Sequence, residues 1–236
     1  MLDVALQNTA VVIANKGCKN MRNVRIFYKK TGRMKFMSHL DMNRYITRLI
    51  KKSRIPIWFT EGFNCHAYIT FALPLSLGMT CDYDSVDIRV IDDSFSNEMV
   101  KTALDNHLTD GMEVISVCEP FMKPADIAFA EYELHFEDKK DTLNKIKVFF
   151  ERDSIFVQKK GKKGKVSEIE LISKIKRLNM DFNDDCLKIN IILPAGNNEN
   201  INPNLFVDKF RSEIGNIEVY EINRKMLYNE KMEKFK

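Results

Sequence analysis

The sequence predicts an α+β protein made of two ferredoxin-like lobes, each with an antiparallel sheet. Segments with the two-residue period of a strand alternate with segments whose apolar residues recur at helical spacing. Their order, strand, helix, strand, strand, helix, strand, is that of a ferredoxin-like unit. The same order starts again after Pro124. We therefore expect lobes at residues 21–124 and 125–236, preceded by an N-terminal extension at residues 1–20.

The first lobe begins with a strand and a helix start. Val24, Ile26 and Tyr28 recur at every second position, which predicts a strand with one buried face. Residues 33–37 are interpreted as a second short strand or as an extension of the first. Ser38 precedes Asp41 by the three residues of a capping box, so we expect a helix to start here.

This helix is expected to have one apolar and one basic face. Its apolar side chains share one side at helical spacing, and they are Met42, Ile46, Leu49 and Ile50. Four cations repeat the same spacing two residues later, on the opposite side, and they are Arg44, Arg48, Lys51 and Lys52. The pattern predicts a helix that packs on the sheet and presents a basic stripe outward.

The remaining elements follow from the same periods and from Pro and Gly positions. In the first lobe we expect further extended segments at 55–59, 69–75, 83–91 and 112–117, and a helix at 97–108. In the second lobe we expect strands at 131–136, 155–159, 186–193 and 217–223, and helices at 142–150 and 204–214. Residues 166–178 mix strand and helix signals.

Neither a membrane nor an oxidising compartment is indicated by the sequence. The longest apolar runs are only a handful of residues, and the N-terminal segment lacks the features of a signal peptide. The five cysteines are widely spaced and never form C-x-x-C, which argues against a disulfide framework or a structural zinc site. We expect a cytoplasmic protein without metal or cofactor. The same spacing excludes the C-x3-C-x2-C cluster of a radical SAM enzyme.

Positive charge is concentrated in one part of the chain. Residues 22–54 hold eleven Lys or Arg and one acid, hence a net charge of +10 in a chain whose total is +4. Such a concentration of one sign is typical of a surface that meets phosphate. The candidate RNA contacts in this stretch are Arg33, Lys35, Arg44, Arg48 and Lys51.

A second basic cluster, KKGKKGK, occupies residues 159–165. Glycine lets the main chain approach a ligand closely and lysine supplies charge, so such a loop can follow a phosphate backbone. A solvated hairpin tip is the alternative explanation. The candidate RNA contacts here are Lys159, Lys160, Lys162, Lys163 and Lys165.

The polar loop EGFNCH at residues 61–66 is the candidate binding lip. If the first helix packs on the sheet, its N-terminus and this loop could lie at one edge, which would bring His39 and His66 together. In the interpretation that we prefer, both histidines and Asn64 hydrogen-bond an RNA or nucleotide group, and Phe63 or Tyr68 offers a stacking surface.

Other interpretations of these residues remain open. They could be purely structural. Alternatively, His39 and His66 act as general acid and base in metal-independent RNA cleavage, because imidazole titrates near neutrality. A metal site formed by these histidines with Asp41 and Cys65 is the least favoured, because no spacing matches an established ligand motif.

Three motifs resemble those of a known family. KFMSHLD at 35–41 with Arg44, EGFNxH at 61–66 and FAxPLxLG at 71–78 are similar to the radical SAM-linked protein family. That family is a bacterial domain of unknown function, found alone or joined to a radical SAM protein with a cobalamin-binding region. The motif residues carried over are Ser38, His39, Asp41, Glu61, Gly62, Phe63, Asn64, Pro74 and Gly78.

The resemblance implies a partnership with a radical SAM protein. Because this chain lacks the cysteines for that chemistry, it would act as an accessory. We expect a protein that binds RNA or a ribonucleoprotein in a basic cleft and presents it to the radical SAM partner, without catalytic activity of its own. An endoribonuclease that uses His39 and His66, and a protein-interaction module that does not bind RNA, are the alternatives.

Overall fold

The computed structural model describes residues 21–160, 166–182, 186–217 and 219–236. The predicted α+β class is confirmed. In the first half of the chain the elements are β1 (Arg22–Lys30), α2 (His39–Lys52), β2 (Ile69–Phe71), β3 (Thr80–Val90), α3 (Asn97–Asp105) and β4 (Met112–Cys118). In the second half they are β5 (Ile127–Glu137), α4 (Lys140–Phe150), β6 (Phe156–Lys160), β7 (Val166–Glu170), β8 (Arg177–Phe182), β9 (Cys186–Pro194), α5 (Asn204–Ile214) and β10 (Val219–Asn229).

Eight of these strands form one mixed sheet. Its order is β4-β1-β3-β10-β5-β9-β8, with β2 paired to β3, and β6 and β7 form a separate hairpin. Strands β3 and β10 run parallel and pair at two positions, whereas the other pairs are antiparallel. The sequence predicted two antiparallel sheets, and the structure has one continuous sheet. The division into two ferredoxin-like lobes stays an interpretation.

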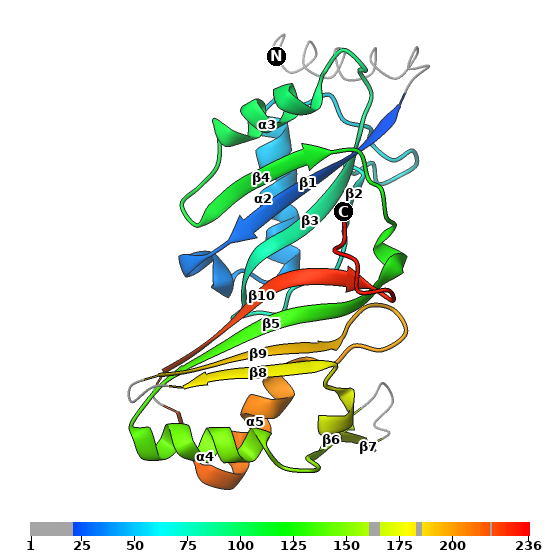
Figure 1. Cartoon of the computed structure of the whole chain (residues 1–236). Helices are drawn as coiled ribbons and strands as arrows, with labels where there is room; N and C mark the ends of the chain where they lie inside the picture. The colour runs from blue at the N-terminus through cyan, green and yellow to red at the C-terminus, as the bar shows by residue number, and fades with distance from the viewer. Residues whose placement is uncertain (1–20, 161–165, 183–185, 218) are drawn as a thin grey trace.

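Two apolar cores lie along this sheet. One core joins β1, β3 and β4 to α2 and α3, and the other joins β5, β9 and β10 to α4 and α5. Figure 1 shows α2 and α3 beside the first set of strands and α4 and α5 beside the second set. The candidate site therefore belongs to the first core, and the seam between β3 and β10 lies between the two cores.

Two expected strands are wrong. Residues 33–37 lie in a 3-10 helix, Gly32–Phe36, because Gly32 has a φ of +56° that turns the chain, and buried Met34 then anchors this turn. Residues 55–59 form only isolated bridges, Ile57 to Val90 and Phe59 to Ala67. They cannot pair further with β3, since β2 already occupies the adjoining stretch of that edge.

Residues 166–178, whose sequence carries mixed signals, contain β7, a short 3-10 helix and the start of β8. In the described part of the chain, we find no helix with the length and apolar content needed to cross a membrane.

Candidate functional site

The start of α2 forms as the sequence predicts. Ser38 Oγ accepts a hydrogen bond from the Asp41 N–H at 3.2 Å and donates one to Asp41 Oδ2 at 2.7 Å. The Ser38 hydroxyl thereby holds the pKa of Asp41 below its usual value. The predicted apolar residues of α2 are buried. The helix therefore has a fixed start and a fixed orientation on the sheet.

The opposite face of α2 carries the predicted cations on its surface. We call these residues the α2 basic stripe, and all four are exposed: Arg44, Arg48, Lys51 and Lys52. Arg44 lies 3.5 Å from Asp41, whereas the other three have no carboxylate partner among the described residues. Lys51 Nζ lies 5.8 Å from the centre of the Phe59 ring. Three cations of this stripe are thus free to meet a ligand's phosphates.

The other cations of residues 22–54 divide among several environments. Arg25 is fully buried and forms a double hydrogen bond with Asp87. Lys29 pairs with Asp82 at 3.6 Å, and Lys30 is buried. The concentrated charge of the sequence is therefore not one continuous surface, because β1 places some of its cations inside the protein.

The expected basic cleft does not coincide with the stripe. The groove beside Lys29 and Lys35 has a volume of about 450 Å³, but Asp82, Glu133 and Glu221 line it too, so its charge is mixed. Arg33 is exposed on the 3-10 helix before α2, and Lys35 is half-buried there. The exposed face of α2 is therefore more uniformly basic than this groove.

The loop at 61–66 projects from the body of the protein. All six residues are exposed, and the Phe63 side chain is fully so. His66 Nδ1 lies 3.0 Å from both Thr60 Oγ1 and the Asn64 carbonyl oxygen, so its ring is held within its own turn. The loop presents the Phe63 ring and the Asn64 amide to solvent, as a binding lip would.

His39 and His66 have different neighbours. The His39 ring packs edge-on against Phe71, with the ring centres 5.0 Å apart. His66 lies five positions before Phe71, which corresponds to about 16 Å along an extended chain. An acid and a base that act on one phosphodiester must each come within about 3 Å of the reacting atoms. This arrangement does not favour cleavage by the pair.

The two remaining sets of predicted RNA contacts are Tyr68 and the lysine loop at residues 159–165. Tyr68 is half-buried, and Arg89 lies 4.5 Å from the centre of its ring, so that face of the ring is already covered. The side chains of Lys159 and Lys160 at the end of β6, and all of Lys162, Lys163 and Lys165, lie outside the described residues. The prediction for the lysine loop stays a prediction.

The motif residues of the first half also have structural tasks. Gly62 and Gly78 adopt positive φ values of +115° and +86°, which glycine accommodates without strain. The Gly78 N–H donates to the Lys35 carbonyl oxygen at 2.8 Å, which holds this segment against the start of α2. The carbonyl groups of Leu73 and Pro74 accept hydrogen bonds from Arg224.

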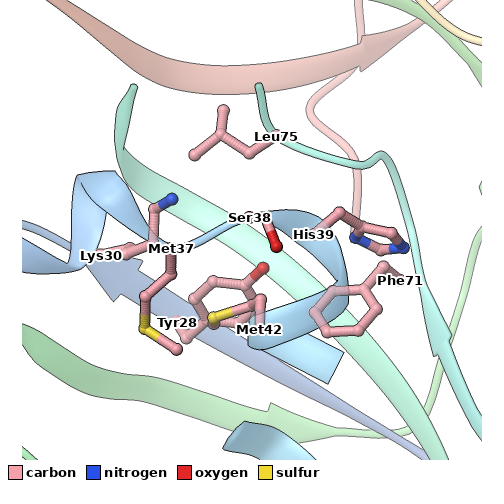
Figure 2. Close-up of a pocket in the computed structure, with 8 residues that line it drawn as sticks. All are labelled: Tyr28, Lys30, Met37, Ser38, His39, Met42, Phe71 and Leu75. Carbon is pink, nitrogen blue, oxygen red and sulfur yellow. The ribbon is translucent and has the colours of Figure 1, made fainter. Parts of the chain in front are cut away.

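A small pocket at the start of α2 was not anticipated. We call it the α2 pocket, and Figure 2 shows its lining: Tyr28, Lys30, Met37, Ser38, His39, Met42, Phe71 and Leu75. Lys30 is only 2% exposed, and burial lowers the pKa of its amine. Burial also raises the pKa of the Tyr28 hydroxyl well above its usual value. The signal in the sequence was a lysine at the inward position of a strand, two residues after Tyr28.

Next to this pocket lies a buried ion pair between the two cores. Arg224 Nε donates to Asp84 Oδ1 at 2.9 Å, and Arg224 Nη2 donates to Asp84 Oδ2 at 2.5 Å. Burial opposes the charge on Arg224, but Asp84 outweighs this effect and keeps the pKa of the guanidinium above its usual value. Arg224 comes from β10 and Asp84 from β3, so the pair connects the two parts of the sheet.

No group of three or more metal-binding side chains with suitable geometry occurs among the described residues. Cys65, Cys81 and Cys118 carry free thiols.

Comparison with known proteins gives a family and no activity. A family model described as an uncharacterized protein conserved in bacteria (DUF2344) matches residues 23–203. No curated protein matches the chain.

Two solved structures resemble the chain only distantly. A chain of a Cbf5-Nop10-Gar1 complex matches 86% of this chain with a TM-score of 0.44 and 9% identity, and this chain spans about half (48%) of that one. An unknown protein from Galdieria sulphuraria matches 87% of this chain, and 98% of its own length, with a TM-score of 0.26 and 8% identity. Neither likeness is close enough to carry an argument about function.

Proposed function

The chain belongs to the DUF2344 family of uncharacterized bacterial proteins, and we propose that it binds RNA through the exposed face of α2. The observation that carries this proposal is the α2 basic stripe, in which Arg48, Lys51 and Lys52 are exposed and have no carboxylate partner among the described residues. Surface cations in folded proteins commonly pair with nearby acids, and a row of unpaired ones attracts a polyanion.

The projecting loop supplies the second element of such a surface. Lys51 lies over Phe59, and Phe59 bridges to Ala67 at the base of the loop, so the loop arises beside the C-terminal half of the stripe. An exposed aromatic ring can stack on an unpaired base, and an amide can hydrogen-bond a base edge. Phe63 and Asn64 are the side chains for these contacts, and single-stranded RNA is the ligand that would use both.

We further propose that the protein is an accessory of a radical SAM partner, to which it presents the bound RNA or ribonucleoprotein. The support is the resemblance of the SHLD, EGFNxH and FAxPLxLG motifs to the radical SAM-linked family, together with cysteine spacing that cannot hold the partner's cluster. In this proposal the chain contributes recognition, and the partner contributes the chemistry.

A protein-interaction module is the second candidate function, and an apolar surface favours it. Phe36, Leu40 and Leu77 are 68%, 59% and 59% exposed. The Gly78 N–H donates to the Lys35 carbonyl oxygen, so Leu77 and Phe36 each adjoin a residue of this backbone contact before α2. Exposed apolar groups that cluster are typical of interaction surfaces. A radical SAM partner would bind here without RNA if this alternative holds.

Binding of fluorescein-labelled tRNA tests the main proposal. The α2 triple variant combines Arg44→Gln, Arg48→Gln and Lys51→Gln. Its matched control combines Lys139→Gln, Lys231→Gln and Lys234→Gln, three exposed lysines away from α2. We expect the α2 triple variant to bind at least tenfold more weakly than the wild type, and the control to bind within about twofold of it, because non-specific affinity depends on local phosphate contacts.

Equal weakening by both variants would refute a specific role for α2. Absence of tRNA binding by the wild type would reject the RNA function and favour the protein-interaction module. A gel of the RNA after incubation completes the experiment, because shortened RNA would support the endoribonuclease alternative.

A further inference from the structure

The α2 pocket is lined by Lys30, a lysine that is only 2% exposed and has no ion-pair partner of its own among the described residues. Among the charged groups next to Lys30, Asp84 is already held by both nitrogens of Arg224. Lys30 itself makes no hydrogen bond or ion pair with any described residue, although it is 2% exposed and lines the pocket. Cys81 and Tyr28 are the other titratable neighbours, and burial keeps both neutral by raising their pKa values. The cluster thus contains two basic side chains, Lys30 and Arg224, and one carboxylate, Asp84.

An ammonium that lines a pocket and has no ion-pair partner of its own is suited to an anion that enters the pocket. Further donors without a partner line this pocket or lie next to it in the chain. The Tyr28 hydroxyl has no hydrogen-bond partner among the described residues, and neither do the N–H groups of His39 and Leu40, whereas the Asp41 and Met42 N–H groups are bonded to Ser38. Unpaired N–H groups in the first turn of a helix favour negative charge.

The size of the pocket limits the anion. The free space is about 10 Å³, which is room for about one water or one oxygen atom. Only one oxygen of an anion would fit among the lining side chains, which include Lys30 and Tyr28, and the rest of the anion would lie outside the pocket, where His39 is exposed. A phosphodiester within a nucleic-acid strand carries two ester substituents, and both would have to fit at this place. A terminal phosphate monoester carries only one.

We propose that the α2 pocket binds a terminal phosphate monoester, with Lys30 and Tyr28 around its innermost oxygen and the first turn of α2 around the others. A monoester carries between about −1.5 and −2 charges at neutral pH and three acceptor oxygens, which suits the unpaired Lys30 amine and the several free donors. If the ligand is RNA, this inference rests on the proposed function. The protein would then recognise the 5′-phosphorylated end of an RNA strand whose backbone lies on α2.

The first experiment uses inorganic phosphate and does not depend on RNA. Thermal unfolding is measured in rising phosphate at constant ionic strength for wild type, Lys30→Met, Tyr28→Phe and the control Lys29→Met. Lys29 projects from the opposite face of β1. We expect phosphate to raise the Tm of wild type and of Lys29→Met, because a ligand of the folded state stabilises it. Lys30→Met should show no shift, and Tyr28→Phe a smaller one.

The second experiment compares RNA of one sequence with a 5′-phosphate or a 5′-hydroxyl. Wild type and Lys29→Met should bind the phosphorylated strand about tenfold more tightly, since a hydrogen bond to a charged group contributes about 1.5 to 3 kcal/mol. Lys30→Met should bind both strands equally, with the affinity that the wild type has for the hydroxyl strand.

The outcomes separate this inference from the RNA proposal. A phosphate-dependent rise in Tm that needs Lys30, in a protein that binds neither RNA, supports the pocket and refutes the RNA function; small phosphate esters are then the ligands. RNA binding without a 5′-phosphate preference, together with no effect of phosphate on Tm, overturns the inference and leaves the RNA function intact. A rise in Tm of equal size in Lys30→Met also overturns it.

Discussion

Arg224 and Asp84 form a buried ion pair between the two parts of the sheet. The exposed fractions of the two side chains are 1% and 2%. Arg224 also donates to the Leu73 carbonyl oxygen at 2.7 Å, and thereby holds the chain that forms one wall of the α2 pocket. Strands β3 and β10 pair at only two positions, and side-chain contacts add to that connection: this buried ion pair, the Lys225–Asp82 ion pair and the hydrogen bond from Thr80 to Glu221.

Removal of the charge on Asp84 should destabilise the protein strongly. We expect Asp84→Asn to lower the free energy of unfolding by about 3 to 5 kcal/mol, because it leaves the buried Arg224 without its counter-charge. Urea unfolding measures the change. The control is Asp82→Asn on the same strand, whose partly exposed ion pairs with Lys29 and Lys225 contribute about 1 kcal/mol or less. Equal effects of the two substitutions would contradict this role of the buried pair.

Sequence patterns reveal some of these residues and not others. Lys30 occupies the inward position of a strand whose other inward residues are apolar, and this break in the apolar alternation is visible in the sequence alone. Arg224 gives no such signal, because its partner Asp84 is 140 residues away and the expected last strand ended at residue 223. Pairing at that separation depends on the tertiary fold.

Helices and strands were predicted correctly where the sequence of the element itself contains the information that determines it. Helix α2 was predicted from the Ser38 cap and the apolar period, both of which lie at or within the helix itself, and the structure confirms it. The segment at 55–59 has the residues of a strand but pairs only at single positions, because the edge of β3 beside it is already taken. Strand formation requires a free neighbour, and a sequence pattern does not contain this information.

Glu170 holds together the two chain segments that flank the β6–β7 hairpin. Its carboxylate accepts hydrogen bonds from the N–H groups of Ile155 at 3.0 Å, Ile172 at 2.8 Å and Ser173 at 2.5 Å. Partial burial acts to raise the pKa of Glu170, but the Ser173 side chain and these N–H groups outweigh it and lower the pKa to about 2. The ionised form thus stabilises the junction of β7 with the following turn.

Glu170→Gln should therefore have an effect that depends on pH. The folded pKa of about 2 lies below the ordinary value of 4.5, so the stabilisation is fully present above pH 4.5 and is lost as the pH falls toward 2. We expect the variant to be less stable than wild type at pH 7, and the difference to shrink below pH 4.5. Urea unfolding across this range measures it, with Glu168→Gln, exposed on the same strand, as the control. A difference that stays constant with pH would contradict the assignment.

In the whole molecule, the fold determines which of the basic side chains of residues 22–54 are buried and which are exposed. Residues 22–54 were expected to form one basic surface, but β1 buries Arg25 and Lys30, and only the cations of α2 and its flanks remain exposed. The continuity of the sheet was equally hidden, since the two positions that join β3 to β10 lie far apart in the sequence. Composition predicted the amount of charge, and packing determined where that charge is accessible.

The salt dependence of tRNA binding, measured by filter binding, tests the central claim most directly. Each phosphate contact contributes about −0.7 to −0.9 to the slope of log affinity against log salt. We predict a wild-type slope steeper than about −3, and a slope shallower by about 2 for the α2 triple variant, with the control variant unchanged. Identical slopes for wild type and the α2 triple variant, or a wild-type affinity that does not respond to salt, would contradict RNA binding on α2.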